Sequence, residues 1–567
     1  MTTDENKKNA RQILRSYVSK YISSTVNFSI NIEKEKTAYF AEKIEFAIEN
    51  DLPIVIHGDY DVDGIISTLF KKLMIEDYAK HLGKEIEVSF VIPDRSSHYG
   101  ISYPVFNTYL EDYGLVITSD NGTHREFFEK LNDKDHENLL IVDHHPNGCF
   151  KEFVNVIDPN IDGSVKISTG MVDEFLFQSL RKRNKEYGES RPQDNFMDLS
   201  AITLISDMAD TNNKAVRSII KAGLKKINER DRAMYSFLWP EFNGAKSKTI
   251  TLEDISFLLI PILNSPGRIG IDANWLIDLM KDTDGGREFS VLARKSIYVN
   301  NARKSASNVF NGIAQGIAEE QLKKGEDNLL SIQIDDCPVG LNGLIAGTVF
   351  QKYMVDTIVV SRNIKGDNLL VGSGRGKAIK AHLLKLVEDF PEISPSLIFG
   401  GHNAAIGLRL LDPTVFNENL EKYNKNPVEF KDLKNERKYV QDTSVSIDEY
   451  REMCDEYANI TSQVPLGDRF HVKVKARIVG VNNYRNNFKK LILSDGNNNL
   501  TVISKENKNI DYESMKDEVL GMAIKPLTRE ETNDVMFTDM VSEKDVTIKH
   551  KKTTDENINT DTLLIKK

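Results

Sequence analysis

Short apolar runs alternate with amphipathic segments between residues 53 and 145, and this alternation predicts a parallel sheet. We expect strands at 54–56, 86–92, 115–118 and 139–142, with helices at 64–82, 104–113 and 126–131. Apolar strands joined by helical crossovers are typical of parallel sheets that helices cover on both faces. In such sheets ligands gather beyond the carboxyl ends of the strands.

The remaining pattern indicates several further units, as a length of 567 residues also does. The first fifty residues have the pattern of helices that cover an edge of the sheet, and residues 165–310 are mainly helical. Strands at 329–334, 357–360 and 369–372 with a helix at 341–353 predict a second α/β unit. We therefore expect an α/β protein with an N-terminal helical extension (1–50), a parallel-sheet domain (51–230), a helical bridge (231–322), a second α/β domain (323–430), a small β-barrel (431–550) and a disordered tail (551–567).

Acidic and imidazole side chains follow three of the apolar runs. His57, Asp59, Asp61 and Asp63 follow the first run, Asp120 follows the second, and Asp143, His144 and His145 follow the third. Like charges so close together repel one another and raise each other's pKa values. A divalent cation removes this repulsion, so the pattern predicts one shared metal site.

The ligand types indicate which metal and which reaction this site serves. Asp61 and Asp63 are two residues apart in an extended loop and can ligate two ions. His57 can complete the ligand shell of the first ion, and Asp120 and His144 come from adjacent strands. Mixed imidazole and carboxylate ligation favours Mn²⁺, with Mg²⁺ as the alternative. Two ions about 3.5–4 Å apart would activate water and stabilise an in-line displacement at phosphorus. Phosphodiester hydrolysis is the reaction that this chemistry predicts.

Some of these residues have simpler explanations. Asp59 could cap the following helix, and we favour that interpretation because its neighbours suffice as ligands. Asp143 could also be a helix N-cap, and His145 could orient Asp143 or contact phosphate. The second ion still lacks a ligand, which Asp207 or Asp210 can supply.

Charge and composition narrow the location and the partners. The net charge of −11 argues weakly against a nucleic-acid partner, but residues 469–490 contain many lysines and arginines and no acid. Aromatic and basic side chains in a polar loop of this segment predict nucleic-acid contacts at Tyr484, Arg485, Phe488 and Lys489. The chain has neither an 18-residue apolar stretch nor a signal-peptide pattern, and its 3 cysteines are far apart, so we expect a cytoplasmic protein without disulfides or membrane contact.

Two glycine-rich segments in the second α/β unit have features of anion sites. Gly400, Gly401 and His402 offer exposed amides and a protonatable ring, suitable for an anion nest. Residues 372–377 superficially resemble a Walker loop, but one residue is missing between the glycines and Ala378 replaces the Ser or Thr, which excludes triphosphate hydrolysis. Arg375 in this segment can hold a phosphate bidentately.

Several motifs together resemble the RecJ-type branch of the DHH phosphoesterase family. Residues 57–64 (His-Gly-Asp-Tyr-Asp-Val-Asp-Gly), 119–122 (Ser-Asp-Asn-Gly), 143–145 (Asp-His-His) and 400–407 carry the resemblance, supported by 92–95 with 99–100, 158–160, 263–268 and 372–375. They run in family order from about residue 50 to 410. The region after residue 431 resembles, more weakly, the oligonucleotide-binding (OB) fold of these enzymes.

The resemblance implies an exonuclease that degrades single-stranded DNA from its 5′ end to nucleoside monophosphates, in DNA repair, recombination or replication. It implies that the metal ligands are His57, Asp61, Asp63, Asp120, His144 and Asp207, and that the catalytic residues are Asp61, Asp63, Asp120, Asp143, His144 and His145. The spacing from Asp198 selects Asp207, although Ala209 before Asp210 fits the family's alanine-aspartate pattern better. By the same resemblance Arg268, Ser373, Arg375, Gly400, Gly401 and His402 bind substrate phosphate.

The expected partners are single-stranded DNA and, as candidates, a helicase or a single-strand-binding protein, with the chain itself a monomer. Abundant Lys, Asn and Ile indicate an AT-rich genome, bacterial or viral, and hence a bacterial or virus-infected bacterial cell. One alternative is a phosphodiesterase of oligoribonucleotides or cyclic dinucleotides, against which the added barrel and bridge argue. The other is an inactive DHH-like replication scaffold, against which the intact acids argue.

Overall fold

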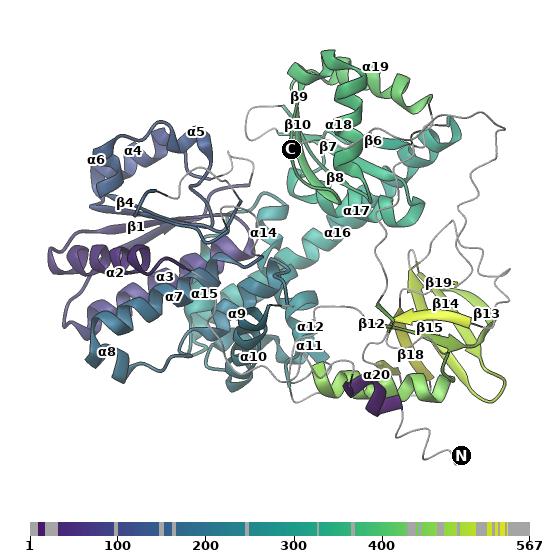
Figure 1. Ribbon diagram of the computed structural model, residues 1–567, viewed down its shortest axis with the longest axis horizontal. Helices are drawn as coiled ribbons and strands as arrows, with labels where there is room; N and C mark the ends of the chain where they lie inside the picture. The colour runs from purple at the N-terminus through teal and green to yellow at the C-terminus, as the bar shows by residue number, and fades with distance from the viewer. Residues whose placement is uncertain are drawn as a thin grey trace.

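The structure is a computed structural model, and its described residues are 10–16, 32–95, 100–146, 152–160, 166–211, 213–243, 249–325, 328–363, 369–426, 428, 438–439, 444–461, 470–484, 488–505, 519–523, 528–530, 533–538 and 541–542. They form two α/β lobes joined by a long helix, and a C-terminal unit that contains β-sheets (Figure 1). The expected α/β fold class is confirmed.

The first lobe contains a five-stranded parallel sheet with the order β2-β1-β3-β4-β5. Its strands are β1 (Ile54–Gly58), β2 (Val88–Val91), β3 (Leu115–Ser119), β4 (Leu139–Val142) and β5 (Val156–Ile157). The four strands predicted from the apolar runs are present, and β5, only two residues long, was not predicted. In this register Gly58, Ser119, Val142 and Ile157 lie side by side at the carboxyl edge.

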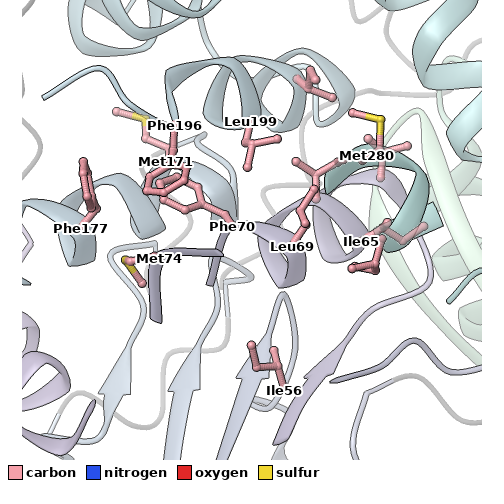
Figure 2. Packing of buried hydrophobic residues seen from close by; sticks show 14 of the residues in the cluster. Ile56, Ile65, Leu69, Phe70, Met74, Met171, Phe177, Phe196, Leu199 and Met280 are labelled. Carbon is pink, nitrogen blue, oxygen red and sulfur yellow. The ribbon is translucent and has the colours of Figure 1, made fainter. Parts of the chain in front are cut away.

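Helices cover both faces of this sheet. Successive residues of a strand point to opposite faces, so each buried strand packs against helices on both sides. Ile54 and Ile56 of β1 pack with α2 (Lys34–Glu49), α3 (Val62–His81), α7 (Thr169–Arg183) and α9 (Met197–Ser206). Val55 points to the opposite face, toward α4 (Tyr103–Asp112) and α5 (Arg125–Phe128). Figure 2 shows Ile56 beneath the side chains Leu69 and Phe70 of α3. Further helices of this part of the chain are α6 (Asp133–Glu137), α8 (Lys185–Ser190), α10 (Lys214–Glu229), α11 (Ala233–Asn243), α12 (Leu252–Asp254), η1 (Ile255–Leu259), α13 (Ile260–Leu263), α14 (Ser265–Arg268) and α15 (Trp275–Lys281).

The helix α16 (Arg287–Lys323) connects the two lobes. At 1.5 Å per residue its 37 residues span about 55 Å. Phe289, Ala293 and Val299 near its start are buried in the core of the first lobe, whereas Ala314 and Ala318 near its end are buried in the second. One continuous helix therefore fixes the separation of the lobes.

The second lobe contains a mixed sheet with the order β6-β7-β8-β10-β9. Its strands are β6 (Leu329–Gln333), β7 (Asp356–Arg362), β8 (Leu370–Arg375), β9 (Leu397–His402) and β10 (Ala405–Leu410), and its helices are η2 (Val339–Leu341), α17 (Asn342–Tyr353), α18 (Ile379–Asp389), η3 (Pro391–Ser396) and α19 (Pro413–Asn424). Gly400 and Gly401 pair with Gly407 and Ile406 in the β9–β10 hairpin. Gly400 and Gly401 therefore lie in an edge strand of this sheet.

The C-terminal unit combines two sheets with the helix α20 (Ile447–Thr461). Their strands are β11 (Lys438–Tyr439), β12 (Phe470–Lys475), β13 (Arg477–Tyr484), β14 (Phe488–Ser494), β15 (Asn499–Lys505), β16 (Val519–Ala523), β17 (Thr528–Glu530), β18 (Asn533–Thr538) and β19 (Val541–Ser542). Helical residues 10–16 also belong to this unit, because Ala10 and Leu14 are buried in its core. The sequence predicts that the first fifty residues cover an edge of the first sheet. Among the described residues of this range, α2 packs in the first lobe, whereas residues 10–16 do not. None of the helices in the described part of the chain combines the length and apolarity that a membrane span requires.

Candidate metal centre

An aspartate follows each of four aligned strand ends in the first lobe. Asp59, Asp120, Asp143 and Asp158 come directly after β1, β3, β4 and β5. The main-chain N–H of Asp120 donates to Val142 O at 3.0 Å and that of Asp59 to Ser119 O at 3.1 Å, so the ladder continues past the strands. The register of the sheet therefore places a row of carboxylates at its carboxyl edge.

The start of α3 adds two further carboxylates to this row. Asp61 is the N-cap of α3, and its side chain accepts a hydrogen bond from Gly64 N at 3.2 Å. Asp63 lies in the first helical turn, so it projects from a helix and not from the extended loop expected from the sequence. A Cβ on Gly64 would lie 2.5 Å from Asp59 O, and only glycine permits this close approach. The capping role expected of Asp59 belongs to Asp61.

The N-terminus of α7 holds Asp63 and Asp120 in place. The backbone amides of Thr169 and Gly170 donate to the two carboxylate oxygens of Asp63 at 2.7 and 3.1 Å, and the Thr169 hydroxyl donates to Asp120 Oδ1 at 3.0 Å. The first amides of a helix have no partner within the helix, so they are available to a carboxylate. Asp120 has a left-handed backbone with φ 67°, which aspartate tolerates better than most residues.

The His144 imidazole lies among three of these carboxylates. His144 Nε2 is 3.1 Å from Asp120 Oδ1, 3.1 Å from Asp207 Oδ2 and 3.4 Å from Asp63 Oδ2. Burial alone would lower the pKa of His144, but the hydrogen bonds to Asp120 and Asp207 raise it well above its ordinary value. Asp207 is the C-cap of α9, whereas Asp210 is exposed.

Three overlapping groups of side chains in the described part of the chain have spacings that suit a metal ion. They consist of Asp120, His144 and His145, of Asp63, His144 and Asp207, and of Asp59, Asp61 and Asp120. Within each group the ligand atoms lie within 4.8 Å of one another. Asp120 and His144 each belong to two groups, so neighbouring ions would share ligands. Asp210 belongs to none of these groups.

The electrostatics of these acids indicate that a cation is needed. Burial and then the charge of Asp120 raise the pKa of Asp61 to about 7, and the same two causes raise that of Asp63 well above its ordinary value. Burial, Asp61 and Asp120 do the same for Asp59, whose Oδ1 is buried without a hydrogen-bond partner in the described chain. Divalent cations would reverse these shifts, because an opposite charge favours the ionised form. The donor set therefore fits divalent ions.

Asp143 and His145 form a second pair beside this centre. Asp143 Oδ1 lies 2.7 Å from His145 Nδ1 and accepts from His144 N at 2.8 Å, while its Oδ2 accepts from the Thr123 hydroxyl at 2.5 Å. Burial alone would raise the pKa of Asp143, but His145 and these hydrogen bonds lower it below its ordinary value. Burial alone would lower the pKa of His145, but Asp143 raises it to about 10. The adjacent Asp143 carboxylate thus favours the protonated, positively charged form of His145.

His57 lies at the end of β1 but in none of the three groups found among the described residues. Its Nδ1 is 3.0 Å from the Tyr109 hydroxyl, and its buried Nε2 lacks a hydrogen-bond partner in this part of the chain. Burial, and to a lesser extent His124, lowers the pKa of His57 to about 4. A neutral ring with one nitrogen oriented and the other unoccupied suits a metal ligand.

Four arginines converge beside the acids where the lobes meet. Burial and the guanidinium groups of Arg95, Arg303 and Arg375 lower the pKa of Arg268 to about 10, while Asp61 acts in the opposite direction. Arg268 donates to Gly340 O at 3.1 Å, Arg375 to Gly374 O at 2.8 Å and Arg303 to Asn300 Oδ1 at 2.8 Å, and Arg95 lies 4.7 Å from the centre of the Tyr60 ring. None of these contact partners among the described residues is a carboxylate, and this suits the cluster to binding an anion.

For the other residues expected to bind phosphate or nucleic acid, the structure gives fewer contacts. Ser373 is near Arg375, since a Cβ on Gly343 would lie 2.8 Å from Arg375 Nη2 and 3.5 Å from Ser373 Oγ. Gly400 is exposed in β9, and Lys380 donates to Gly401 O at 3.0 Å. Lys489 in β14 donates to Asn483 Oδ1 at 2.5 Å. The side chains of His402, Tyr484 and Phe488, and all of Arg485, lie outside the described residues.

The sequence interpretation missed several residues of this centre. Asp59 is recognised after the first apolar run but interpreted as a helix cap. Asp158 follows a strand end like the predicted acids, and Arg95 follows β2 by a few residues, so the strand-end pattern could have identified both. Thr169 and Arg303 lie on helices far along the chain and carry no comparable signal.

Known protein families and proteins are similar to this chain in sequence. Residues 53–204 match the model of the DHH family, N-terminal domain. The single-stranded-DNA-specific exonuclease RecJ of Dickeya dadantii is 26% identical over 394 residues, which are 65% of this chain and 66% of that protein. RecJ of Bacillus subtilis is 28% identical over 378 residues, 65% of this chain and 45% of the relative. The chain thus matches just under two thirds of the first relative and less than half of the second.

Solved structures share the fold. The crystal structure of RecJ from Thermus thermophilus in complex with Mn²⁺ superposes with a TM-score of 0.68 at 18% identity, covering 94% of this chain and 76% of that one. A second structure, of exonuclease RecJ bound to manganese, has a TM-score of 0.53 at 22% identity and covers 70% of this chain and 95% of that one. These similarities extend the likeness beyond the first lobe.

Proposed function

We propose that this chain is a RecJ-type protein of the DHH family and a divalent-metal-dependent exonuclease that acts on single-stranded DNA. Cleavage would proceed from the 5′ end, release nucleoside monophosphates and use two ions, with Mn²⁺ preferred and Mg²⁺ as the alternative. The role would be in DNA repair, recombination or replication.

The observation that supports this function most strongly is a set of acids and imidazoles facing a cluster of arginines. Three ligand groups that share Asp120 and His144 can hold adjacent cations. Arg268 is close enough to Asp61 for each charge to affect the other. A phosphodiester placed between acids and arginines would contact metal ions on one side and guanidinium groups on the other. This arrangement favours phosphoryl chemistry over other metal-dependent hydrolysis.

The residues of the chain have distinct roles in this proposal. Asp61, Asp63, Asp120, His144 and Asp207 would hold the ions, with His57 and Asp59 as further ligands. When bound, divalent ions supply an activated water and stabilise the charge on the attacking and leaving oxygens. The amides of Thr169 and Gly170 keep Asp63 oriented, and the Thr169 hydroxyl orients Asp120.

Cationic side chains would bind the phosphate to be cleaved. Arg268 lies in α14, Arg375 in β8 and Arg95 in the segment after β2. Guanidinium groups from both lobes would therefore bind one phosphate. Ser373, Gly400, Gly401 and His402 extend this phosphate site along the second lobe. His145, held by Asp143 and protonated, would donate a hydrogen bond to a phosphoryl oxygen.

The C-terminal unit would guide the strand toward this centre. Lys489 and the neighbouring Tyr484, Arg485 and Phe488 are the proposed contacts, through base stacking and backbone charge. Single-stranded DNA is the proposed partner, delivered by a helicase or a single-strand-binding protein to a monomeric enzyme.

The decisive experiment follows both ends of a single-stranded oligonucleotide in Mn²⁺. With a 5′ label, the wild-type protein should release labelled mononucleotide as the first product, whereas a 3′ label should persist in progressively shorter strands. Asp61→Asn and Asp207→Asn should lower the rate roughly a hundredfold or more, because an isosteric amide cannot replace an anionic ligand. Asp210→Asn, an exposed carboxylate outside the ligand groups, is the matched control and should retain the rate.

Other outcomes would favour the rival functions. Cleavage restricted to short oligoribonucleotides or cyclic dinucleotides would indicate a phosphodiesterase of small substrates. Binding of single-stranded DNA without cleavage in Mn²⁺ or Mg²⁺ would indicate a replication scaffold. Release of label from the 3′ end first would contradict the proposed polarity.

A further inference from the structure

Lys71 and Asp173 form a fully buried ion pair behind the candidate metal centre. Both side chains are 0% exposed, and Lys71 Nζ lies 2.7 Å from Asp173 Oδ1. Lys71 Nζ also donates to Ser119 Oγ at 2.8 Å, and Ser119 Oγ is 2.7 Å from Ser67 Oγ. Neither carboxylate oxygen of Asp173 has another hydrogen-bond partner in the described chain, so Lys71 is what balances its charge. The pair links α3, α7 and β3.

These three elements are the ones that carry the central acids. Asp63 and Lys71 lie on α3, eight residues or about two turns apart. Thr169 lies on α7 one turn before Asp173, and Asp120 directly follows Ser119 at the end of β3. The Lys71–Asp173 pair therefore lies one layer below the contacts of Thr169 and Gly170 with Asp63 and Asp120.

Stability alone is a poor explanation for such a pair. Burying two charges has a large desolvation cost, and apolar residues of similar volume often stabilise a core equally well. An ion pair differs from apolar packing because it has directional requirements, and Lys71 meets them with Asp173 and Ser119 at the same time. The pair thus fixes the distance of α7 from α3 and β3, because a shift of α7 along either element would break the contact between Lys71 and Asp173.

We propose that Lys71 and Asp173 are positioning residues of the metal centre, which fix the N-terminus of α7 so that its amides orient Asp63 and the Thr169 hydroxyl orients Asp120. The inference rests on the proposed metal-dependent function. Neither side chain belongs to the candidate ligand groups found among the described residues. Their effect passes through α7 and through Ser119 to the two carboxylates.

The test replaces the pair by apolar residues in the full-length chain. Lys71→Met combined with Asp173→Leu should leave the unfolding temperature of the metal-free protein close to wild type, because both charges are removed together. The Kd for Mn²⁺, measured by titration calorimetry, should rise about tenfold. On single-stranded DNA kcat should fall while KM stays unchanged, because the phosphate-binding arginines are not affected.

A second ion pair on the same helix provides the matched control. Arg191 Nε and Asp77 Oδ2 lie 2.7 Å apart, and Asp77 is on α3 beyond Lys71. Arg191→Met with Asp77→Leu removes an ion pair between α3 and the end of α8 but touches none of the central acids. Its Kd for Mn²⁺ should remain at the wild-type value.

The outcomes separate this inference from the proposed function. An Mn²⁺ affinity and kcat equal to wild type in the Lys71/Asp173 double variant would overturn the positioning role, even if the wild-type protein cleaves DNA. A weakened Mn²⁺ affinity in a protein whose wild type cleaves no DNA would support the positioning role and reject the nuclease. If the double variant does not fold, Ser119→Ala takes its place. A smaller loss of Mn²⁺ affinity would then support the role, and no loss would overturn it.

Discussion

Asp59 shows how much the role of one carboxylate depends on its surroundings. It follows a strand and precedes a helix, a position in which aspartate commonly caps the helix. Asp61, two residues later, is the N-cap of α3. Asp59 is only 3% exposed and lies near Asp61 and Asp120. A buried carboxylate with an unpartnered oxygen is unfavourable without a cation, so Asp59 is better explained as a ligand than as a structural residue.

Replacing Asp59 with asparagine should therefore weaken metal binding. Asn keeps the shape and the hydrogen-bonding capacity but removes the charge, so the Kd for Mn²⁺ should rise roughly tenfold. Titration calorimetry on the full-length protein measures this change. Asp112→Asn, at the exposed end of α4, should leave the Kd unchanged, and an unchanged Kd in Asp59→Asn as well would mean that Asp59 has no part in holding ions.

Gly343 has a role that depends on the space beside Arg375. A methyl group there would lie 2.8 Å from Arg375 Nη2, which must then move. Gly343→Ala should raise the KM for single-stranded DNA several-fold with little change in kcat, because the displaced guanidinium would bind phosphate less well. Gly312→Ala, where an added methyl meets nothing within 4 Å, should leave KM unaffected and stabilise α16 by about 0.5–1 kcal/mol. Equal KM values for the two variants would contradict the role of Arg375.

Single residues also show what the sequence could and could not reveal. The rule that ligands follow strand ends brought together Asp61, Asp63, Asp120 and His144, because a parallel sheet aligns those ends. It could not identify Thr169, since a hydroxyl at a helix start commonly serves only the helix itself. Arg303 lies within a long helix whose pattern indicates packing and gives no indication of the partner.

At the scale of secondary structure elements, α18 and the loop before it support the second half of the candidate site. The buried Asp356 carboxylate accepts from Lys377 N and Ala378 N, both at 2.8 Å, and so holds the segment that follows Arg375. His382 of α18 lies beside it, with Nε2 3.9 Å from Asp356 Oδ2 and Nδ1 2.8 Å from the Tyr423 hydroxyl.

This arrangement predicts that α18 becomes less stable in acid. Burial lowers the pKa of His382 from 6.5 to about 4, so between these values the unfolded chain binds a proton that the folded chain does not. Stability is therefore lost as the pH falls below 6.5, by about 2 kcal/mol at pH 5. Hydrogen exchange of the α18 amides at pH 7 and pH 5, corrected for intrinsic rates, measures this loss.

His382→Gln provides the comparison for that experiment. Glutamine can still hydrogen-bond to Tyr423 but does not titrate, so the acid sensitivity of α18 should become smaller. The same pH dependence in wild type and variant would show that another group is responsible.

The prediction of elements from the sequence had a similar limit. Continuous apolar runs predicted β1 to β4 of the first lobe and β6 to β8 of the second, because a strand buried on both faces leaves a clear signature, whereas β9 and β10 were not predicted. The two-residue β5 is too short for any periodicity, and α3 begins two residues before its predicted start because Asp61 serves as its cap. Gly400 and Gly401 did not indicate a strand in the sequence, but an edge strand also accommodates glycine.

At the scale of the whole molecule, residues 10–16, near the start of the chain, pack into the C-terminal unit. Ala10 and Leu14 are buried with Tyr450 and Met453 in the C-terminal unit, and Arg15 forms an ion pair with Glu456. Along the chain, the C-terminal unit follows the second lobe. Residues 10–16 precede the first lobe and pack in the core of the C-terminal unit, so this unit is tied to both lobes. No periodicity could have predicted this contact, since an amphipathic helix does not specify which distant surface it covers.

Shortening Leu14 should loosen that contact. Leu14→Ala should destabilise the C-terminal unit by about 2–5 kcal/mol, the usual cost of removing a buried leucine side chain. Limited proteolysis should then cut the C-terminal unit sooner while the first lobe stays protected. Gln12→Ala, on the exposed face of the same segment, should digest like wild type, and equal digestion of both variants would show that the segment does not stabilise this unit.

The central claim is that side chains from separate strands and helices hold divalent cations at one edge of the first sheet. Diffraction from crystals soaked in Mn²⁺, recorded at the manganese absorption edge, tests it most directly. We predict two anomalous peaks, bounded by Asp61, Asp63, Asp120, His144 and Asp207. A map with no peak among these side chains, in crystals that diffract well and have taken up manganese elsewhere, would contradict the account.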